Sequence, residues 1–139
     1  MSQMNLSIII PCFNEEGSIN SLLNELYEHF GDVQNYEVIL VDDGSHVRLE
    51  EAIESSLKEE QLIILRNDFN KGQTQSIKSG LNHSRGKVIG LLDGDGQNPP
   101  SALRKLYDRF LIDEKKYDAV ISFREKRKDS SSKRITSRL

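Results

Sequence analysis

The sequence predicts an α/β domain in which a mostly parallel sheet is covered by helices on both faces. Apolar segments of strand length alternate with amphipathic segments of helix length, which favours right-handed crossovers between parallel strands. The strand segments are almost continuously apolar, as expected for strands buried on both sides. Polar residues follow most of these segments. Because parallel strands all end at one edge of a sheet, we expect a site at that edge.

The first strand and helix come from the start of the chain. Residues 6–10 form a short β-branched apolar run, and we expect this strand to end at Pro11. Apolar residues then recur at helical spacing until Gly31, which predicts a helix. The apolar positions of this helix are Ile19, Leu22, Leu23, Leu26, Tyr27 and Phe30.

The middle of the chain repeats this alternation. Residues 36–41 predict a second strand, residues 49–57 a weaker helix, and residues 62–65 a third strand. Residues 72–84 predict a helix with small or polar side chains and few large apolar ones. This composition indicates either close packing of the helix or a ligand nearby.

The last part of the chain contains the most distinctive segment. Residues 88–92 predict a buried fourth strand, Pro100 opens a helix that carries several large apolar residues, and residues 119–123 predict a fifth strand. Residues 1–123 therefore form the expected core. Residues 124–139 form a separate basic tail with seven basic and two acidic residues.

Length and composition limit the possible functions. A chain of 139 residues with 36% hydrophobic residues suits one domain with a sizeable core. A net charge of −3 argues against a general nucleic-acid binder. The single cysteine, Cys12, excludes a disulfide framework and suits a reducing compartment. No apolar run approaches the roughly 20 residues that span a bilayer, so we expect a cytoplasmic location.

The fourth strand ends in a pair of carboxylates. Asp93 and Asp95 lie two residues apart, so strand periodicity directs both side chains to the same side. Two carboxylates this close favour a cation between them, and Gly94 and Gly96 leave room for a bulky ligand. Mg²⁺ or Mn²⁺ carrying a diphosphate fits this arrangement. The alternative interpretation is an acidic turn after a strand.

Several other sites are excluded by spacing. The chain has no phosphate-binding P-loop, and no glycine-rich dinucleotide motif follows the first strand. The segment that starts at Asp93 fails as a calcium-binding loop, because its sixth position is Asn98 and its twelfth is Arg104. Cys12 has no histidine in a recognisable relation to it, so a thiol nucleophile is disfavoured.

Three blocks of the sequence resemble the signatures of family 2 glycosyltransferases. These blocks are residues 9–16 (IIPCFNEE), residues 41–45 (VDDGS) and residues 93–95 (DGD). The segments RN at 66–67, KGQT at 71–74, DGDGQNPP at 93–100 and the basic stretch from Arg124 resemble the polyprenyl-phosphate branch, which includes dolichyl-phosphate mannose synthase and the undecaprenyl-phosphate glycosyltransferases. The resemblance implies the GT-A fold, a Rossmann-like three-layer α/β/α arrangement.

The resemblance also implies roles for particular residues. The nucleotide-sugar pocket would contain Pro11, Phe13, Glu15, Val41, Asp42, Asp43, Asp93, Gly94 and Asp95. The metal ligands would be Asp93, Asp95 and Gln97, and the phosphate-binding residues would be Arg124 and Lys133. Asp93, Asp95 and Arg124 would be the catalytic residues.

The implied activity is an inverting, metal-assisted transfer of a sugar from a UDP- or GDP-sugar to a polyprenyl phosphate at the membrane surface. The chain would then lie in the cytoplasm, at the inner face of the membrane, with a homo-oligomer or a membrane partner as further possibilities. Family members normally continue into an acceptor-binding half, so this chain is expected to be truncated. Two alternatives stay open: a family 2 transferase with a polysaccharide or protein hydroxyl as acceptor, and a non-catalytic module that binds nucleotide-sugars.

Overall fold

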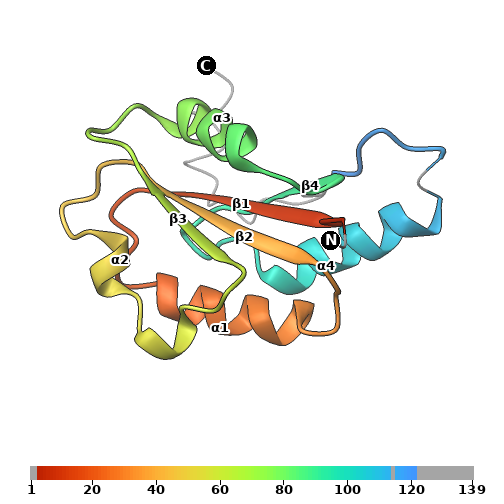
Figure 1. Ribbon diagram of the computed structural model, residues 1–139, viewed down its shortest axis with the longest axis horizontal. Helices are drawn as coiled ribbons and strands as arrows, with labels where there is room; N and C mark the ends of the chain where they lie inside the picture. The colour runs from red at the N-terminus through yellow and green to blue at the C-terminus, as the bar shows by residue number, and fades with distance from the viewer. Residues whose placement is uncertain (1–2, 114, 122–139) are drawn as a thin grey trace, which may run out of the picture.

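Four parallel strands form the centre of the structure, a computed structural model that describes residues 3–113 and 115–121. The sheet order is β3-β2-β1-β4, with β1 at Leu6–Cys12, β2 at Tyr36–Asp42, β3 at Leu62–Arg66 and β4 at Val88–Leu91. Helices α1 (Ile19–Phe30), α2 (Leu49–Ala52) and α4 (Pro100–Ile112) lie on one face, and α3 (Gln73–His83) lies on the other (Figure 1). The predicted three-layer α/β architecture is confirmed.

Strand β1 is the centre of the core. It pairs in parallel with β2 along its whole length and with β4 from Leu6 to Ile9. Because side chains alternate along a strand, Ile8 and Ile10 join the large core beneath α1 and α4, while Ile9 packs with Ile39 on the α3 face. Both faces of β1 are therefore closed to solvent, which holds its carboxyl end in a fixed place.

Helix α3 lies close to the sheet because its buried residues are small. Ser76 and Gly80 are its buried positions, and a Cβ atom at Gly80 would lie 2.5 Å from Cγ2 of Ile9. This contact leaves no space for a larger side chain. The sparse apolar pattern of residues 72–84 thus reflects close packing, one of the two explanations expected from the sequence.

Two elements differ clearly from those expected. Strand β1 continues through Pro11, which pairs with Val41 of β2 beyond the point where β4 ends its own pairing. Proline is tolerated in a strand at a position where no neighbouring strand offers an acceptor for the N–H that proline lacks. The weak helix at 49–57 is only one turn long, because Ile53 is extended, and a 3₁₀ turn follows at Ser55–Leu57.

The predicted fifth strand is not present in the part of it that the structure describes. Residues 119–121 are not in a strand, and residues 122–123 lie outside the described residues, as does the predicted tail at 124–139. No helix within the described ranges combines the length and apolar character needed to cross a bilayer.

A buried carboxylate joins three segments at the amino-terminal edge of the sheet. Glu37 of β2 is fully buried and accepts hydrogen bonds from Oγ of Ser7 at 2.7 Å and from Nη2 of Arg85 at 2.7 Å. Oγ of Ser7 in turn accepts from the backbone N–H of Gly86 at 2.8 Å. Burial alone would raise the pKa of Glu37, but the hydrogen bonds from Ser7 and Arg85 outweigh it and lower this pKa. The network ties the segment that leads into β4 to β1 and β2.

We expect the Glu37→Gln substitution to lower the free energy of unfolding at pH 7 by about 1–3 kcal/mol, because an amide cannot accept every donor that now meets the carboxylate. The folded pKa lies below the ordinary value of 4.5, so the contribution of the carboxylate is present above that pH and is lost as the pH falls through the folded pKa. The difference between the variant and the parent should therefore shrink on acidification.

Urea denaturation at pH 7 and at about pH 3.5 measures this difference, with exposed Glu60→Gln as the matched control. An equal loss of stability at both pH values would contradict the role of the ionised carboxylate.

Candidate functional site

A cavity of about 320 Å³ lies at the carboxyl edge of the sheet. The ends of β1, β2 and β4 and the start of α3 contribute its lining, which gathers the polar segments that the sequence placed at this edge. The lining residues are Pro11, Cys12, Phe13, Glu15, Asp43, Asn70, Gly72, Gln73, Ser76, Asp93, Gly94 and Asp95. A cavity is therefore present at the edge of the sheet where the parallel topology led us to expect a site.

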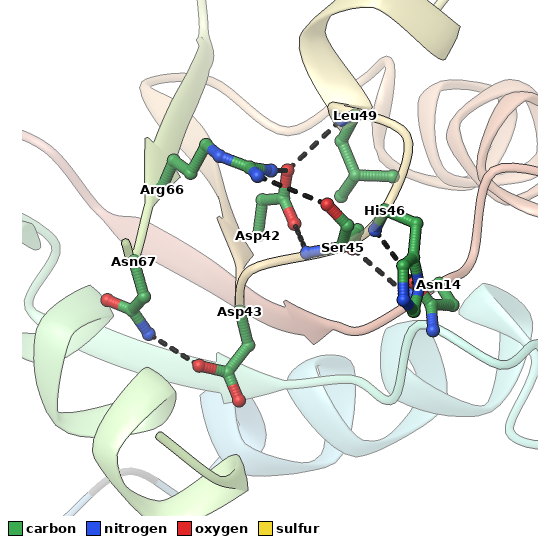
Figure 2. Close-up of polar contacts among 8 residues, drawn as sticks. All are labelled: Asn14, Asp42, Asp43, Ser45, His46, Leu49, Arg66 and Asn67. Atoms are coloured by element: carbon green, nitrogen blue, oxygen red, sulfur yellow. Dashed lines mark hydrogen bonds and ion pairs between the residues drawn. The ribbon is translucent and has the colours of Figure 1, made fainter. Parts of the chain in front are cut away.

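The segment after β1 is fixed by Asn14. Its backbone adopts the left-handed conformation, with φ of 54°, and its N–H donates to Oγ of Ser45 at 2.9 Å. Oδ1 of Asn14 accepts from the backbone N–H of His46 at 3.0 Å (Figure 2). These contacts join the segment after β1 to the segment after β2. Phe13, next to Asn14, is 42% exposed in the cavity wall, where a flat ligand ring can stack on it.

Asp42 stabilises the segment after β2 from outside the cavity. Its carboxylate accepts from the backbone N–H groups of Ser45 at 2.9 Å and Leu49 at 3.1 Å, and it forms an ion pair with Arg66 at 2.6 Å (Figure 2). Burial alone would raise the pKa of Asp42, but these hydrogen bonds outweigh it and lower the pKa. The carboxylate is 1% exposed and faces α2 rather than the cavity.

Asp43 points to the opposite side of the strand end and holds the loop before α3. Its carboxylate accepts from Nδ2 of Asn67 at 2.8 Å and from the backbone N–H groups of Lys71 and Gly72, each at 2.9 Å (Figure 2 shows the Asn67 contact). Burial would raise the pKa of Asp43, but these donors outweigh it and lower the pKa. The aspartate thereby fixes the loop that enters α3.

Gly44 is required where this loop crosses the end of β2. Its φ of +75° is unfavourable for other residues, and a Cβ atom there would lie 2.7 Å from the carbonyl carbon of Phe69. The segment DDGS thus has three structural tasks in sequence: Asp42 anchors α2, Asp43 anchors the loop before α3, and Gly44 lets that loop pass.

Asp93 and Asp95 lie beyond the end of β4, at the cavity. Oδ1 of Asp93 accepts from Nε2 of Gln73 at 3.0 Å, and Oδ2 accepts from Nδ2 of Asn98 at 3.2 Å. Oδ1 of Asp95 accepts from the backbone N–H of Gln97 at 2.9 Å. Gly94 between them is buried, and its carbonyl accepts from Oγ of Ser18 at the start of α1. The acidic turn is therefore attached to both α3 and α1.

The donor set of this turn fits a hard divalent cation. Two carboxylates face one cavity, and each keeps lone pairs that no hydrogen bond uses. Mg²⁺ and Mn²⁺ prefer oxygen ligands, and Mg²⁺ commonly takes one or two carboxylates and completes its shell with phosphate oxygens and water. Within residues 3–113 and 115–121, no group of three His, Cys, Asp or Glu side chains is close enough to hold a metal.

The thiol of Cys12 is packed against this turn. A Cβ atom at Gly94 would lie 2.7 Å from Sγ of Cys12 and 3.0 Å from the carbonyl oxygen of Pro11. Burial, with the nearby charges of Glu15 and Asp42, raises the pKa of the thiol to about 12. Cys12 is thus a protonated packing residue at neutral pH, in agreement with the sequence argument against a thiol nucleophile.

The structure separates the expected site residues into three groups. Seven line the cavity: Pro11, Phe13, Glu15, Asp43, Asp93, Gly94 and Asp95. Three lie outside its lining: Val41 is buried on the α3 face of the sheet, Asp42 faces α2, and Gln97 is exposed beyond the turn. Arg124 and Lys133 lie outside the described residues.

Sequence reasoning gave no site role to three polar residues in the lining, Asn70, Gln73 and Ser76. They come from the end of the β3–α3 loop and the first turns of α3. The available signal was the polar run after β3, since that strand ends at the same edge of the sheet as the others.

Comparison with known protein families gives a match over almost the whole chain. The sequence profile of Glycosyl transferase family 2 matches residues 7–139. The undecaprenyl-phosphate 4-deoxy-4-formamido-L-arabinose transferase of Aeromonas hydrophila is 35% identical over 137 residues, which cover 96% of this chain and 41% of that protein. The protein of the same name from Shewanella sediminis is 36% identical over 139 residues, covering 96% and 40%. The chain thus spans about two fifths of the length of these relatives.

Solved structures resemble the fold. TarS 1–349 from S. aureus in complex with UDP matches with a TM-score of 0.67 at 23% identity, over 80% of this chain and 33% of that one. The mannosyltransferase PcManGT from Pyrobaculum calidifontis, in complex with GDP-Man and Mn²⁺, matches with a TM-score of 0.60 at 21% identity, over 68% and 28%. At this identity the likeness concerns the fold alone, and it confirms the expected GT-A fold.

The contact between Gly94 and Cys12 predicts a coupled pair of substitutions. Gly94→Ala should lower the free energy of unfolding by about 1–3 kcal/mol, because the added methyl group overlaps Sγ of Cys12. In a Cys12→Ala background the same change should cost less, because the sulfur atom is gone.

A double-mutant cycle of unfolding free energies measures this coupling. Equal costs of Gly94→Ala in both backgrounds would show that the methyl group is resisted by the Pro11 carbonyl rather than by the thiol.

Proposed function

The chain belongs to glycosyltransferase family 2, and we propose that its cavity binds the nucleotide-sugar donor for transfer of a sugar to a polyprenyl phosphate. The observation that carries this proposal is the convergence of an exposed aromatic ring, Phe13, and an acidic turn, Asp93 to Asp95, on one cavity. A nucleotide-sugar has a flat base at one end and a diphosphate at the other, so it needs both.

We infer that the base of the donor stacks near Phe13, with Pro11, Glu15 and Asp43 around it. Asp43 is held rigidly by the side-chain amide of Asn67 and the backbone N–H groups of Lys71 and Gly72, so it would give this side of the pocket a fixed shape. Val41 and Asp42 would support this pocket from beneath rather than contact the nucleotide. Both UDP and GDP are candidates, since solved structures of the same fold hold UDP in one case and GDP-Man in another.

The diphosphate would lie at the acidic turn. Two carboxylates repel a diphosphate unless a cation lies between them, so Asp93 and Asp95 suit a donor that arrives with Mg²⁺ or Mn²⁺. Bound there, the cation would neutralise the charge that develops on the departing nucleoside diphosphate. Arg124 and Lys133 are proposed to approach the phosphates of donor or acceptor. With Asp93 and Asp95, Arg124 completes the proposed catalytic set.

A lipid phosphate acceptor suits this site because it needs no base. The second pKa of a phosphate monoester is about 6, so the acceptor is already a nucleophile at neutral pH. Attack opposite the leaving diphosphate would invert the configuration at the sugar carbon. The arabinose transferases that the chain resembles carry undecaprenyl phosphate in their names, which supports this class of acceptor. Such an acceptor would place the working protein at the inner face of a membrane.

The proposal is tested by calorimetric titration of the purified chain with UDP and with GDP, each with and without Mn²⁺. Binding of one nucleotide that depends on Mn²⁺ is the expected result, and it would identify the base. Mass spectrometry of undecaprenyl phosphate incubated with the matching nucleotide-sugars then tests transfer. Binding of neither nucleotide, with or without metal, would overturn the assignment of the cavity.

Asp95→Ala should remove most of the Mn²⁺-dependent part of nucleotide binding. Loss of even an outer-shell partner of a metal commonly costs about 10–100-fold in affinity, so loss of a direct ligand should cost more than about tenfold. Asp68→Ala is the matched control, because Asp68 is an exposed aspartate at the same edge but outside the cavity lining. Unchanged affinity of the Asp95 variant would remove this carboxylate from the metal site.

A further inference from the structure

Gln73 and Asn98 surround the carboxylate of Asp93 with neutral donors. Nε2 of Gln73 reaches Oδ1 at 3.0 Å, and Nδ2 of Asn98 reaches Oδ2 at 3.2 Å. Gln73 comes from the first turn of α3, and Asn98 from the turn before α4, so the two amides approach from separate elements. We propose that this amide pair is a positioning device that aims Asp93 at the divalent cation of the donor complex.

The inference rests on the proposed function and extends it to residues that had no assigned role. A carboxylate has about four lone-pair sites, and the amide pair uses one on each oxygen. The remaining sites are free for a cation. Hydrogen-bonded partners of this kind fix the direction in which a ligand presents its electron pairs, and they commonly set metal affinity.

The neutral charge of the amides matters as much as their position. A lysine or arginine bound to Asp93 would cancel the charge that attracts the cation, whereas an amide orients the carboxylate and leaves its charge intact. Lys71 lies only two residues before Gln73, yet its Nζ lies 5.2 Å from the centre of the Phe69 ring. The protein thus presents an amide to Asp93 and directs the neighbouring cation elsewhere.

The backbone that carries Gln73 is held in place by Asp43. The Asp43 carboxylate accepts from the N–H groups of Lys71 and Gly72, the two residues directly before Gln73. Asn98 is followed by Pro99 and Pro100, whose rings restrict the backbone at the start of α4. The amide pair is therefore mounted on two restrained segments. A continuous set of contacts links the proposed base-binding Asp43 to the proposed metal ligand Asp93.

The test measures Mn²⁺ affinity by electron paramagnetic resonance of free and bound Mn²⁺, in the presence of UDP or GDP, whichever the parent chain binds. Gln73→Ala should weaken Mn²⁺ binding by about tenfold and alter the spectrum of the bound ion. Gln75→Ala is the matched control, because Gln75 is exposed on the same helix two residues further on and lies outside the cavity lining. Its affinity should match that of the parent.

A charge-swap pair separates orientation from charge. Gln73→Lys places a cation at Asp93 and should weaken Mn²⁺ binding more than alanine does, while Gln75→Lys adds the same charge elsewhere on the helix. Thermal unfolding without metal should be nearly the same for each Gln73 variant and its Gln75 control. If Gln73→Ala fails to fold, Asn98→Ala carries the same expectation from the other side of the carboxylate.

The outcomes distinguish this inference from the proposed function. A parent chain that binds no Mn²⁺ with either nucleotide would overturn the proposed function and this inference with it. A parent chain that binds Mn²⁺ while Gln73→Ala binds it equally well would overturn the inference alone. Tighter Mn²⁺ binding by Gln73→Ala would also overturn it, because the amide would then compete with the cation rather than position its ligand.

Discussion

The enclosure of β1 is the constraint on which the rest of the structure depends. This strand is hydrogen-bonded to β2 on one side and β4 on the other, and helices cover both of its faces. A strand held in four directions cannot move without loss of the core. The carboxyl end of β1 is therefore fixed in place. Phe13 follows β1 directly, and Asp43 and Asp93 lie just beyond the ends of its neighbours β2 and β4.

Five acidic residues on the strands or just beyond their ends differ in what their lone pairs bind. Glu37 and Asp42 are buried and spend their hydrogen-bonding capacity on backbone N–H groups, a hydroxyl group and arginines. Asp93 and Asp95 lie at the cavity and accept mainly from neutral amides. Asp43 shares features of both groups, because it is buried and holds a loop but also borders the cavity. Acidic residues of similar appearance in sequence thus divide, through their surroundings, into structural supports and carboxylates that border the cavity.

Much of the fold could be predicted from sequence, because each apolar run has a clear period and clear ends. The four strands and the long helices lie close to where the pattern places them. The errors arose where contacts with distant residues accompany the local outcome. Strand β1 continues through Pro11 at a point where β4 no longer pairs with it. Helix α2 ends at Ala52, where Asn20 of α1 bonds to the backbone of Ala52 and Glu54. Residues 119–121 have the apolar character of a strand but form no strand pairing. Strand propensity alone does not supply a neighbour.

The site was predictable as a location but less so as a set of contacts. Parallel topology brings the carboxyl ends of all strands to one edge, so the sequence alone groups Asp93 with Asp43. The division of labour between Asp42 and Asp43 depends on strand alternation combined with the path of the loop across Gly44. The proposed role of Gln73 depends on a contact between residues twenty positions apart, and no pattern in a single sequence marks that contact.

The order of pairing in the sheet has a kinetic consequence. Strands β1 and β2 are separated in the chain by one helix, whereas β1 and β4 are separated by two strands, β2 and β3, and by the three helices α1, α2 and α3. Contacts between distant segments form late in folding, because closing a longer loop costs more entropy. We expect the half of the cavity around Phe13 and Asp43 to assemble first and the acidic turn to dock last. Stalled or interrupted folding would then yield a species in which the proposed base pocket is formed but the proposed cation site is not.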